Sequence, residues 1–168
     1  TLEAYKFLAK RSAFVIALTV SLKRVLLGTA ISMFLIIITA YPLSKDKKQL
    51  MWRISYVWFF VFTMFFSGGL IPSFIIVKNT GLIDSIWALV LPGALNVWNM
   101  VMLLNFFRGV PKEMEEAAII DGANHWTILW RLYIPVSKPA IATILLFTIV
   151  NHWNAWFDGI LYMNTPTK

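Results

Sequence analysis

The stretch VPKEMEEAAIIDGANHWTILWRLYIPVSKP, residues 110–139, is the one long polar interruption in a chain that is otherwise close to continuous hydrocarbon. Pro111 suits the first turn of a helix, where its missing N–H costs nothing, and the acidic residues that follow favour the positive end of the helix dipole. Asp121 and Gly122 then supply a turn, because glycine readily adopts a left-handed conformation. We therefore predict one short helix between Pro111 and Gly122.

A second helix is predicted between that turn and Pro135. Asn124 can cap its first turn. Four large apolar side chains recur at the i, i+3, i+4 and i+7 spacing of one helix face: Trp126, Leu129, Trp130 and Tyr133. Pro135 is expected to end this helix, because proline has no N–H to continue it. The product is a helix-turn-helix that lies at the surface of a membrane.

The composition identifies a membrane protein. Of 168 residues, 59% are hydrophobic and 14% are charged, which lies far outside the range of soluble globular domains. The chain has no cysteine, so neither a disulfide framework nor a thiolate metal site is expected. Its net charge of +7 comes from basic residues clustered beside apolar runs. Anionic lipid and membrane topology account for such clusters better than a nucleic acid does.

Four apolar runs are predicted to cross the membrane: residues 25–43, 54–77, 85–107 and 140–162. Residues 1–24 carry basic side chains too often for a bilayer core, and we expect an interfacial lead-in helix there. Gly68, Gly69 and Pro72 are expected to kink or unwind the second run, and Pro92-Gly93 to interrupt the third.

If the four runs alternate in direction, the basic loop at residues 44–53 and the polar stretch fall on the same side of the membrane. The counts of Lys and Arg on the two sides are nearly equal, so the positive-inside rule barely discriminates between the two orientations. Counting Lys and Arg only in the short connecting loops favours a cytoplasmic position for the polar stretch. We call this stretch the coupling loop and define it as residues 108–139.

Nothing in the sequence looks like a catalytic or metal-binding constellation. His125 and His152 belong to different sides of the membrane in this topology and lack ligand spacing, so we expect each to be a polar surface or interhelical group. The sequence has no glycine-rich phosphate loop with its lysine. We therefore predict that the chain is not an enzyme, does not hydrolyse ATP and binds no metal or cofactor itself.

The first helix of the coupling loop has a face suited to contact with another protein. Glu113, Glu116 and Ile120 share that face at i, i+3 and i+7, and Ala117 beside Glu116 allows another surface to approach closely. The alternative is a capped amphipathic helix that merely rests on lipid headgroups. The residues by themselves leave both interpretations open.

Five residues of the third and fourth runs are candidates to line a path for a sugar: Asn96, Asn99, Asn151, Trp153 and Asn154. Amides supply donors and acceptors for hydroxyl groups, and an aromatic face stacks on the apolar side of a pyranose. Asn151, Asn154 and Asp158 would share one face of a single helix. The alternative is that the asparagines hydrogen-bond between helices and the tryptophans lie in an interfacial aromatic belt.

Residues 116–135 resemble the signature cytoplasmic loop of permease subunits of bacterial ABC importers, written E-A-A, three residues, G, nine or so more, I-x-L-P. The sequence EAAIIDGA at 116–123 matches its first part, and at its end Ile134 stands before Pro135 where the pattern has leucine. Leu132 stands where the pattern has isoleucine, which changes shape slightly but not chemistry. Four further stretches are similar to the carbohydrate-uptake branch, which includes the maltose-type and polysaccharide-fragment permeases: AYPLSK at 40–45, GGLIP at 68–72, LPGA at 91–94 and HWNAWFD at 152–158.

This resemblance implies an all-α membrane protein with the type I importer fold, in which residues 1–168 form a single transmembrane domain and are part of a six-span subunit. The coupling loop would dock into a cytoplasmic ATPase, which would bind ATP and magnesium. The implied docking residues are Glu113, Glu116, Ala117, Ile120, Asp121 and Gly122. The other implied partners are a second homologous permease, a second ATPase subunit, an extracytoplasmic sugar-binding protein and the lipid of the bacterial inner membrane.

The sequence and the resemblance together predict a permease subunit of an ATP-driven importer of oligosaccharides. Closure of two ATPases on ATP would move the coupling loops as rigid bodies and rock the spans between inward and outward openings. The alternatives are the same architecture for a non-sugar solute, a membrane scaffold without a transport path, and an intramembrane enzyme acting on a lipid-linked sugar. The enzyme would need converging acids or histidines, and His152 with Asp158 do not make such a site.

Overall fold

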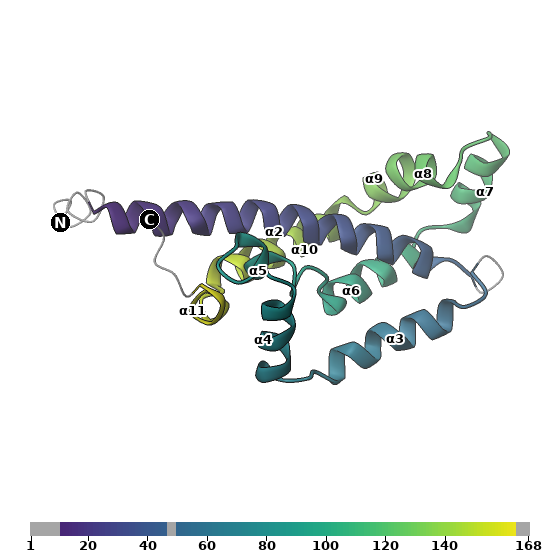
Figure 1. Cartoon of the computed structure of the whole chain (residues 1–168). Helices are drawn as coiled ribbons and strands as arrows, with labels where there is room; N and C mark the ends of the chain where they lie inside the picture. Colours follow the sequence, from purple (N-terminus) through teal and green to yellow (C-terminus); the bar gives the residue numbers. More distant parts are fainter. Residues whose placement is uncertain (1–10, 47–49, 164–168) are drawn as a thin grey trace.

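The computed structural model describes residues 11–46 and 50–163, and every regular element in these ranges is helical. Figure 1 shows their arrangement. In chain order the helices are α2 (Ser12–Ser44), α3 (Arg53–Phe65), α4 (Leu70–Asn79), α5 (Ile86–Val90), α6 (Val97–Arg108), α7 (Lys112–Ile120), α8 (His125–Ile128), the π-helix η1 (Leu129–Tyr133), α9 (Ile134–Val136), α10 (Lys138–Asn154) and α11 (Phe157–Tyr162). The all-helical fold class is confirmed.

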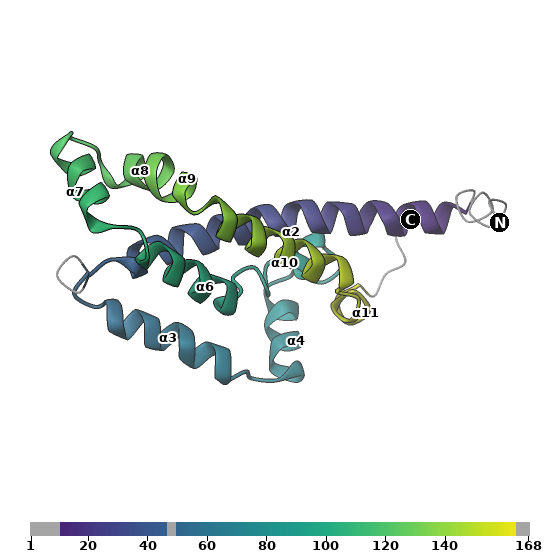
Figure 2. The same ribbon diagram turned by 180° about the vertical axis from the view of Figure 1, so that it is seen from behind.

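The long helix α2 is the element against which the others pack. Both α6 and α10 lie along it (Figures 1 and 2), and the three helices enclose the main core around Ile36, Leu103 and Ile144. At Gly28, α2 and α10 approach each other closely, because a Cβ added there would lie 2.5 Å from the ring of His152. A larger residue at position 28 would therefore push the two helices apart.

The expected boundary between a lead-in helix and a first span at residue 25 is wrong, because α2 is continuous from Ser12 to Ser44. Ala13–Ser44 has the length and hydropathy of a membrane span. Arg24, which argued for an interfacial segment, is only 6% exposed and forms an ion pair with Asp158. Pairing offsets part of the cost of placing its charge among apolar helices. Residues 1–10 of the lead-in segment lie outside the described residues.

The breaks predicted in the second and third runs are confirmed. Between α3 and α4 the chain bends by 111°, and Gly69 has a φ of 85°, in the left-handed region that favours glycine. Pro92-Gly93 lies between α5 and α6, so the third run consists of a 5-residue and a 12-residue helix. A 12-residue helix spans about 18 Å, which is too short for a hydrocarbon core of about 30 Å.

A break in the fourth run was not predicted. The helix α10 ends at Asn154 and α11 begins at Phe157, so the expectation that Asp158 shares a helix face with Asn151 is wrong. The break frees the carbonyl of Ala155, which accepts a hydrogen bond of 2.7 Å from Arg24 Nη1. A buried carbonyl needs such a partner, and a long-range contact provides it here.

By length and hydropathy, α2 is the one helix in the described part of the chain that could cross a membrane alone. Two bent pairs qualify if each counts as one span. The pair α3 and α4 bends by 111°, and the pair formed by His125–Val136 and α10 bends by 83°.

Candidate functional site

The coupling loop folds as two short helical units joined by a left-handed turn. The helix α7 begins directly after Pro111, and Gly122 has a φ of 80°, as the predicted turn requires. The Asn124 side chain caps α8 by accepting a hydrogen bond of 2.8 Å from the backbone N–H of Thr127. The predicted helix-turn-helix is therefore confirmed in both its turn and its cap.

Pro135 does not end the second helix, which corrects the prediction. The backbone widens into the π-helix η1, where the N–H of Ile134 bonds to the carbonyl of Leu129 five residues earlier. Pro135 then falls in the first turn of α9, where its missing N–H is tolerated. Of the four apolar side chains predicted on one face of this helix, Leu129 and Tyr133 are buried, whereas Trp126 and Trp130 are exposed.

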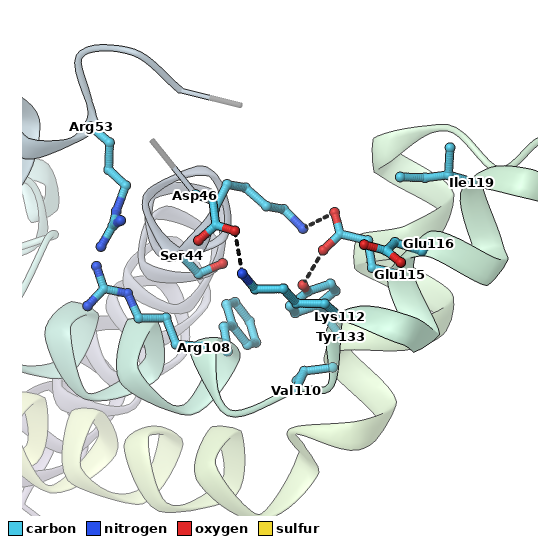
Figure 3. Close-up of a pocket in the computed structure, with 12 residues that line it drawn as sticks. Ser44, Asp46, Arg53, Arg108, Val110, Lys112, Glu115, Glu116, Ile119 and Tyr133 are labelled. Carbon is cyan, nitrogen blue, oxygen red and sulfur yellow. Dashed lines mark hydrogen bonds and ion pairs between the residues drawn. The ribbon is translucent and has the colours of Figure 1, made fainter. Parts of the chain in front are cut away.

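A buried ion pair fixes α7 to the end of α2. Lys45 Nζ donates a 2.6 Å hydrogen bond to Oε1 of Glu115, and the Tyr133 hydroxyl donates a 2.6 Å bond to Oε2 (Figure 3). The same ammonium lies 4.1 Å from the ring centre of Tyr41 and 4.2 Å from that of Tyr133, within cation–π range. We call these four residues, Tyr41, Lys45, Glu115 and Tyr133, the anchor. It connects α2, α7 and η1.

Burial and pairing shift the pKa values of Glu115 and Lys45 in opposite directions. Burial raises the pKa of Glu115, but the hydrogen bonds from Lys45 and Tyr133 and the charge of Lys45 outweigh it, so this pKa lies below its usual 4.5. Burial lowers the pKa of Lys45, and the opposing hydrogen bond and charge of Glu115 do not fully compensate. Glu115 therefore remains a carboxylate at neutral pH.

The predicted docking residues all lie on the exposed side of α7 and its turn. Ile120 is 85% exposed, and the neighbouring apolar side chains of Met114 and Ile119 are also exposed. The other five predicted residues are exposed as well: Glu113, Glu116, Ala117, Asp121 and Gly122. The opposite side of α7 carries Glu115 toward the anchor. The structure thus gives the helix one attached face and one free face.

The five predicted path residues separate into two groups. Asn96 caps α6, because its Oδ1 accepts a 3.1 Å hydrogen bond from the N–H of Asn99. The Asn99 side chain is buried and lies 3.4 Å from Thr148 Oγ1, which is the interhelical arrangement named as the alternative. Asn96 is itself exposed, as are the remaining three, Asn151, Trp153 and Asn154, which lie near the end of α10.

Sequence reasoning missed the two long-range ion pairs whose basic residue is buried. Lys45 was assigned to a basic loop and Arg24 to an interfacial helix, yet both are buried and paired, with Glu115 and Asp158 respectively. The available signal was a basic residue close to or within an apolar run, because such a residue needs a partner. The sequence gives no indication of which acid that partner is.

The two histidines occupy separate environments. His125 Nδ1 lies 3.4 Å from the Tyr41 hydroxyl beside the anchor. His152 is buried between α10 and α2, with Nε2 3.5 Å from Ser32 Oγ. No group of three or more metal-ligating side chains is found among the residues described.

Comparison with known proteins agrees with this geometry. The family described as "Binding-protein-dependent transport system inner membrane component" matches residues 13–163. Over its full length the chain is 45% identical to the polygalacturonan/rhamnogalacturonan transport system permease protein YtcP of Bacillus subtilis (strain 168) and 41% identical to protein LplC of the same organism. It covers 58% and 56% of those proteins, so it spans little more than half of their length.

A solved structure shares the fold. The crystal structure of a bacterial ABC transporter involved in the import of the acidic polysaccharide alginate aligns with a TM-score of 0.92 and 32% sequence identity. The alignment covers 96% of this chain and 57% of that chain. The arrangement of the helices around α2 is therefore that of an importer permease.

Proposed function

Because the chain belongs to the family of binding-protein-dependent transport system inner membrane components, we propose that it acts in the permease subunit of an ATP-driven importer of oligosaccharides. The names of its relatives support a carbohydrate cargo, since one is a polygalacturonan/rhamnogalacturonan permease and a structural neighbour imports alginate. The observation that carries the coupling role is the division of α7 into a buried face held by the anchor and an exposed face with apolar residues.

The exposed face of α7 is proposed to dock into a cytoplasmic ATPase. Ile120, Ile119 and Met114 leave apolar surface uncovered at the tip of the molecule, and such clustered surface is typical of a protein contact. Glu113 and Glu116 flank it with charges that a basic groove would pair.

The anchor gives this contact a mechanical role. When two ATPases close on ATP, α7 is proposed to move with them as a rigid body, and the Lys45–Glu115 pair passes the movement to the end of α2. Since α2 packs along both α6 and α10, tilting α2 would shift the helices that carry the exposed residues Asn151 and Asn154. This connects the ATPase contact to the transport path.

The proposed assembly contains a second homologous permease, two ATPase subunits and an extracytoplasmic sugar-binding protein, in the multi-pass setting of the bacterial inner membrane. ATP and magnesium are assigned to the ATPases, and no metal or cofactor to this chain. The exposed aromatic side chains of α3, including Trp58 and Phe62, are available for contacts with lipid or with the second permease.

Reversing the charge of Glu116 is expected to remove the ATPase from the complex. Co-purification of the full-length subunit from its native membrane, with mass spectrometry of the bound chains, should recover the ATPase and a second permease with wild type. With Glu116→Lys the ATPase should fall at least tenfold while the second permease stays. Lys138→Glu is the matched control, because it reverses an exposed charge at the C-terminal end of the coupling loop, outside α7. Equal ATPase recovery in both variants would refute the docking assignment.

The exposed group at the end of α10 is proposed to contact the sugar. Asn151 and Asn154 are the stronger candidates, since Asn96 and Asn99 are engaged within the fold. Each asparagine replaced by alanine should raise the KM for uptake about fivefold, which corresponds to about 1 kcal/mol for one lost hydrogen bond. Asn105→Ala, an exposed asparagine of α6 near the coupling loop, is the control. Unchanged uptake of every sugar tested would eliminate this path.

A further inference from the structure

A polar pocket of about 240 Å³ lies where the end of α2, the start of α3, the end of α6 and α7 meet. Arg53 enters it from α3 and Arg108 from α6, and Figure 3 shows their guanidinium groups pointing toward one another. Each positive charge disfavours the other at close range, and an anion between them would relieve that repulsion. The arrangement therefore indicates a site for an anion.

Of the five other charged side chains of the pocket, four are paired with one another, and the fifth, Glu116, is exposed. Lys45 binds Glu115, and Lys112 binds Asp46. Neither arginine has an ion-pair partner among the residues that the structure describes. The Nε of Arg53 donates a 2.9 Å hydrogen bond to the carbonyl of Leu43, which orients the side chain and leaves its terminal amino groups for a ligand.

The surroundings of the pocket suit a lipid. A groove of about 510 Å³ on α3 is lined by Trp52, Ser55, Tyr56, Phe59 and Phe60, and it starts one residue from Arg53. These are mainly aromatic side chains, on which an acyl chain can lie. The site therefore combines a cationic pocket with an adjacent apolar groove.

We propose that this pocket binds the phosphate headgroup of an anionic phospholipid from the leaflet nearest the coupling loop. Guanidinium groups present planar forks of donors that match phosphate oxygens, and basic pockets between spanning helices are suited to such headgroups. The headgroup phosphate lies between Arg53 and Arg108, and an acyl chain follows the groove on α3. The lipid thereby joins α3 to α6 beside the anchor.

The assembled transporter, purified in detergent and titrated with phosphatidylglycerol, tests this site by native mass spectrometry. Arg53→Gln and Arg108→Gln should each weaken lipid binding about fivefold, and the double variant about 25-fold, given about 1 kcal/mol per basic residue at a lipid headgroup. Arg131→Gln, an exposed arginine of the coupling loop outside the pocket, should bind as wild type does. Phosphatidylcholine should bind weakly to all five proteins.

Two further measurements distinguish a bound phospholipid from a soluble phosphate and from a contact with another protein. If inorganic phosphate at millimolar concentration displaces phosphatidylglycerol from wild type, the pocket takes a soluble phosphate and the lipid assignment is wrong. If the double variant retains phosphatidylglycerol but loses the ATPase, the arginines serve a protein contact and the proposal is overturned. ATPase recovery is measured in the same spectra, so failure of the lipid site is distinguishable from failure of the importer function.

Discussion

Replacing Lys45 by alanine is expected to detach α7 from α2 and to uncouple ATP hydrolysis from transport. The substitution leaves the Glu115 carboxylate buried with only the Tyr133 hydroxyl as partner. Removing one member of a buried ion pair costs about 3 kcal/mol or more, because the remaining charge is uncompensated. Amide hydrogen exchange in α7 of the full-length subunit should therefore become faster, by up to about 150-fold for that free energy.

A double-mutant cycle isolates the contribution of the pair. Lys45→Ala combined with Glu115→Ala removes both charges, so the double variant should lose less protection than the sum of the single variants. Lys112→Ala is the matched control, because its ion pair with Asp46 joins the same two parts of the chain but is exposed to water. We expect that control to exchange nearly as wild type does. Additive single and double variants would contradict the role of the anchor.

The same pair gives α7 a pH dependence. The native pKa of Glu115 lies below 4.5, so its contribution to stability is present above pH 4.5 and is lost as the pH falls through the native pKa. Protection of α7, corrected for the intrinsic exchange rate, should decline in that range for wild type. In Glu115→Gln the decline should be absent, because the amide does not titrate.

Local features of the coupling loop were predictable because their causes are adjacent in the sequence. Pro111, Gly122 and Asn124 act on backbone within a few residues of themselves, and each does in the structure what its chemistry indicated. The breaks at Gly69 and at Pro92-Gly93 belong to the same class. In all these places a single residue type restricts the backbone whatever its tertiary environment is.

The errors share a different cause, which is dependence on distant partners. Lys45 and Glu115 are 70 residues apart, and Arg24 and Asp158 are 134 residues apart. Patterns among neighbouring residues therefore cannot identify these partners. The π-helix is a second case, because a proline that ends an isolated helix is accommodated here by a widened turn. Sequence reasoning therefore identified the exposed face of α7 that we propose for docking, but not the buried residues that hold the opposite face.

Neutralising Asp158 is expected to destabilise the helical core more than any exposed substitution. Arg24 donates to both carboxylate oxygens of Asp158, to the carbonyl of Ala155 and, at 3.3 Å, to the carbonyl of Leu89. One side chain thus joins α2 to α11 and to α5, and it satisfies carbonyls at or near helix ends. Asp158→Asn leaves the guanidinium buried without its counter-charge, at a cost of about 3 kcal/mol or more.

Thermal unfolding of the full-length subunit in detergent measures this effect. Asp158→Asn should lower the Tm clearly, and Arg24→Met combined with Asp158→Leu should recover part of the loss, because apolar side chains can replace a buried ion pair. Lys23→Met is the matched control, since it removes the exposed neighbouring charge and should leave the Tm almost unchanged. If Asp158→Asn unfolds at the wild-type temperature, Arg24 is held by its two carbonyl acceptors alone. In that case the hydrogen bonds from Arg24 to these two backbone carbonyls, rather than the ion pair, would allow a charged side chain to lie within the continuous helix α2.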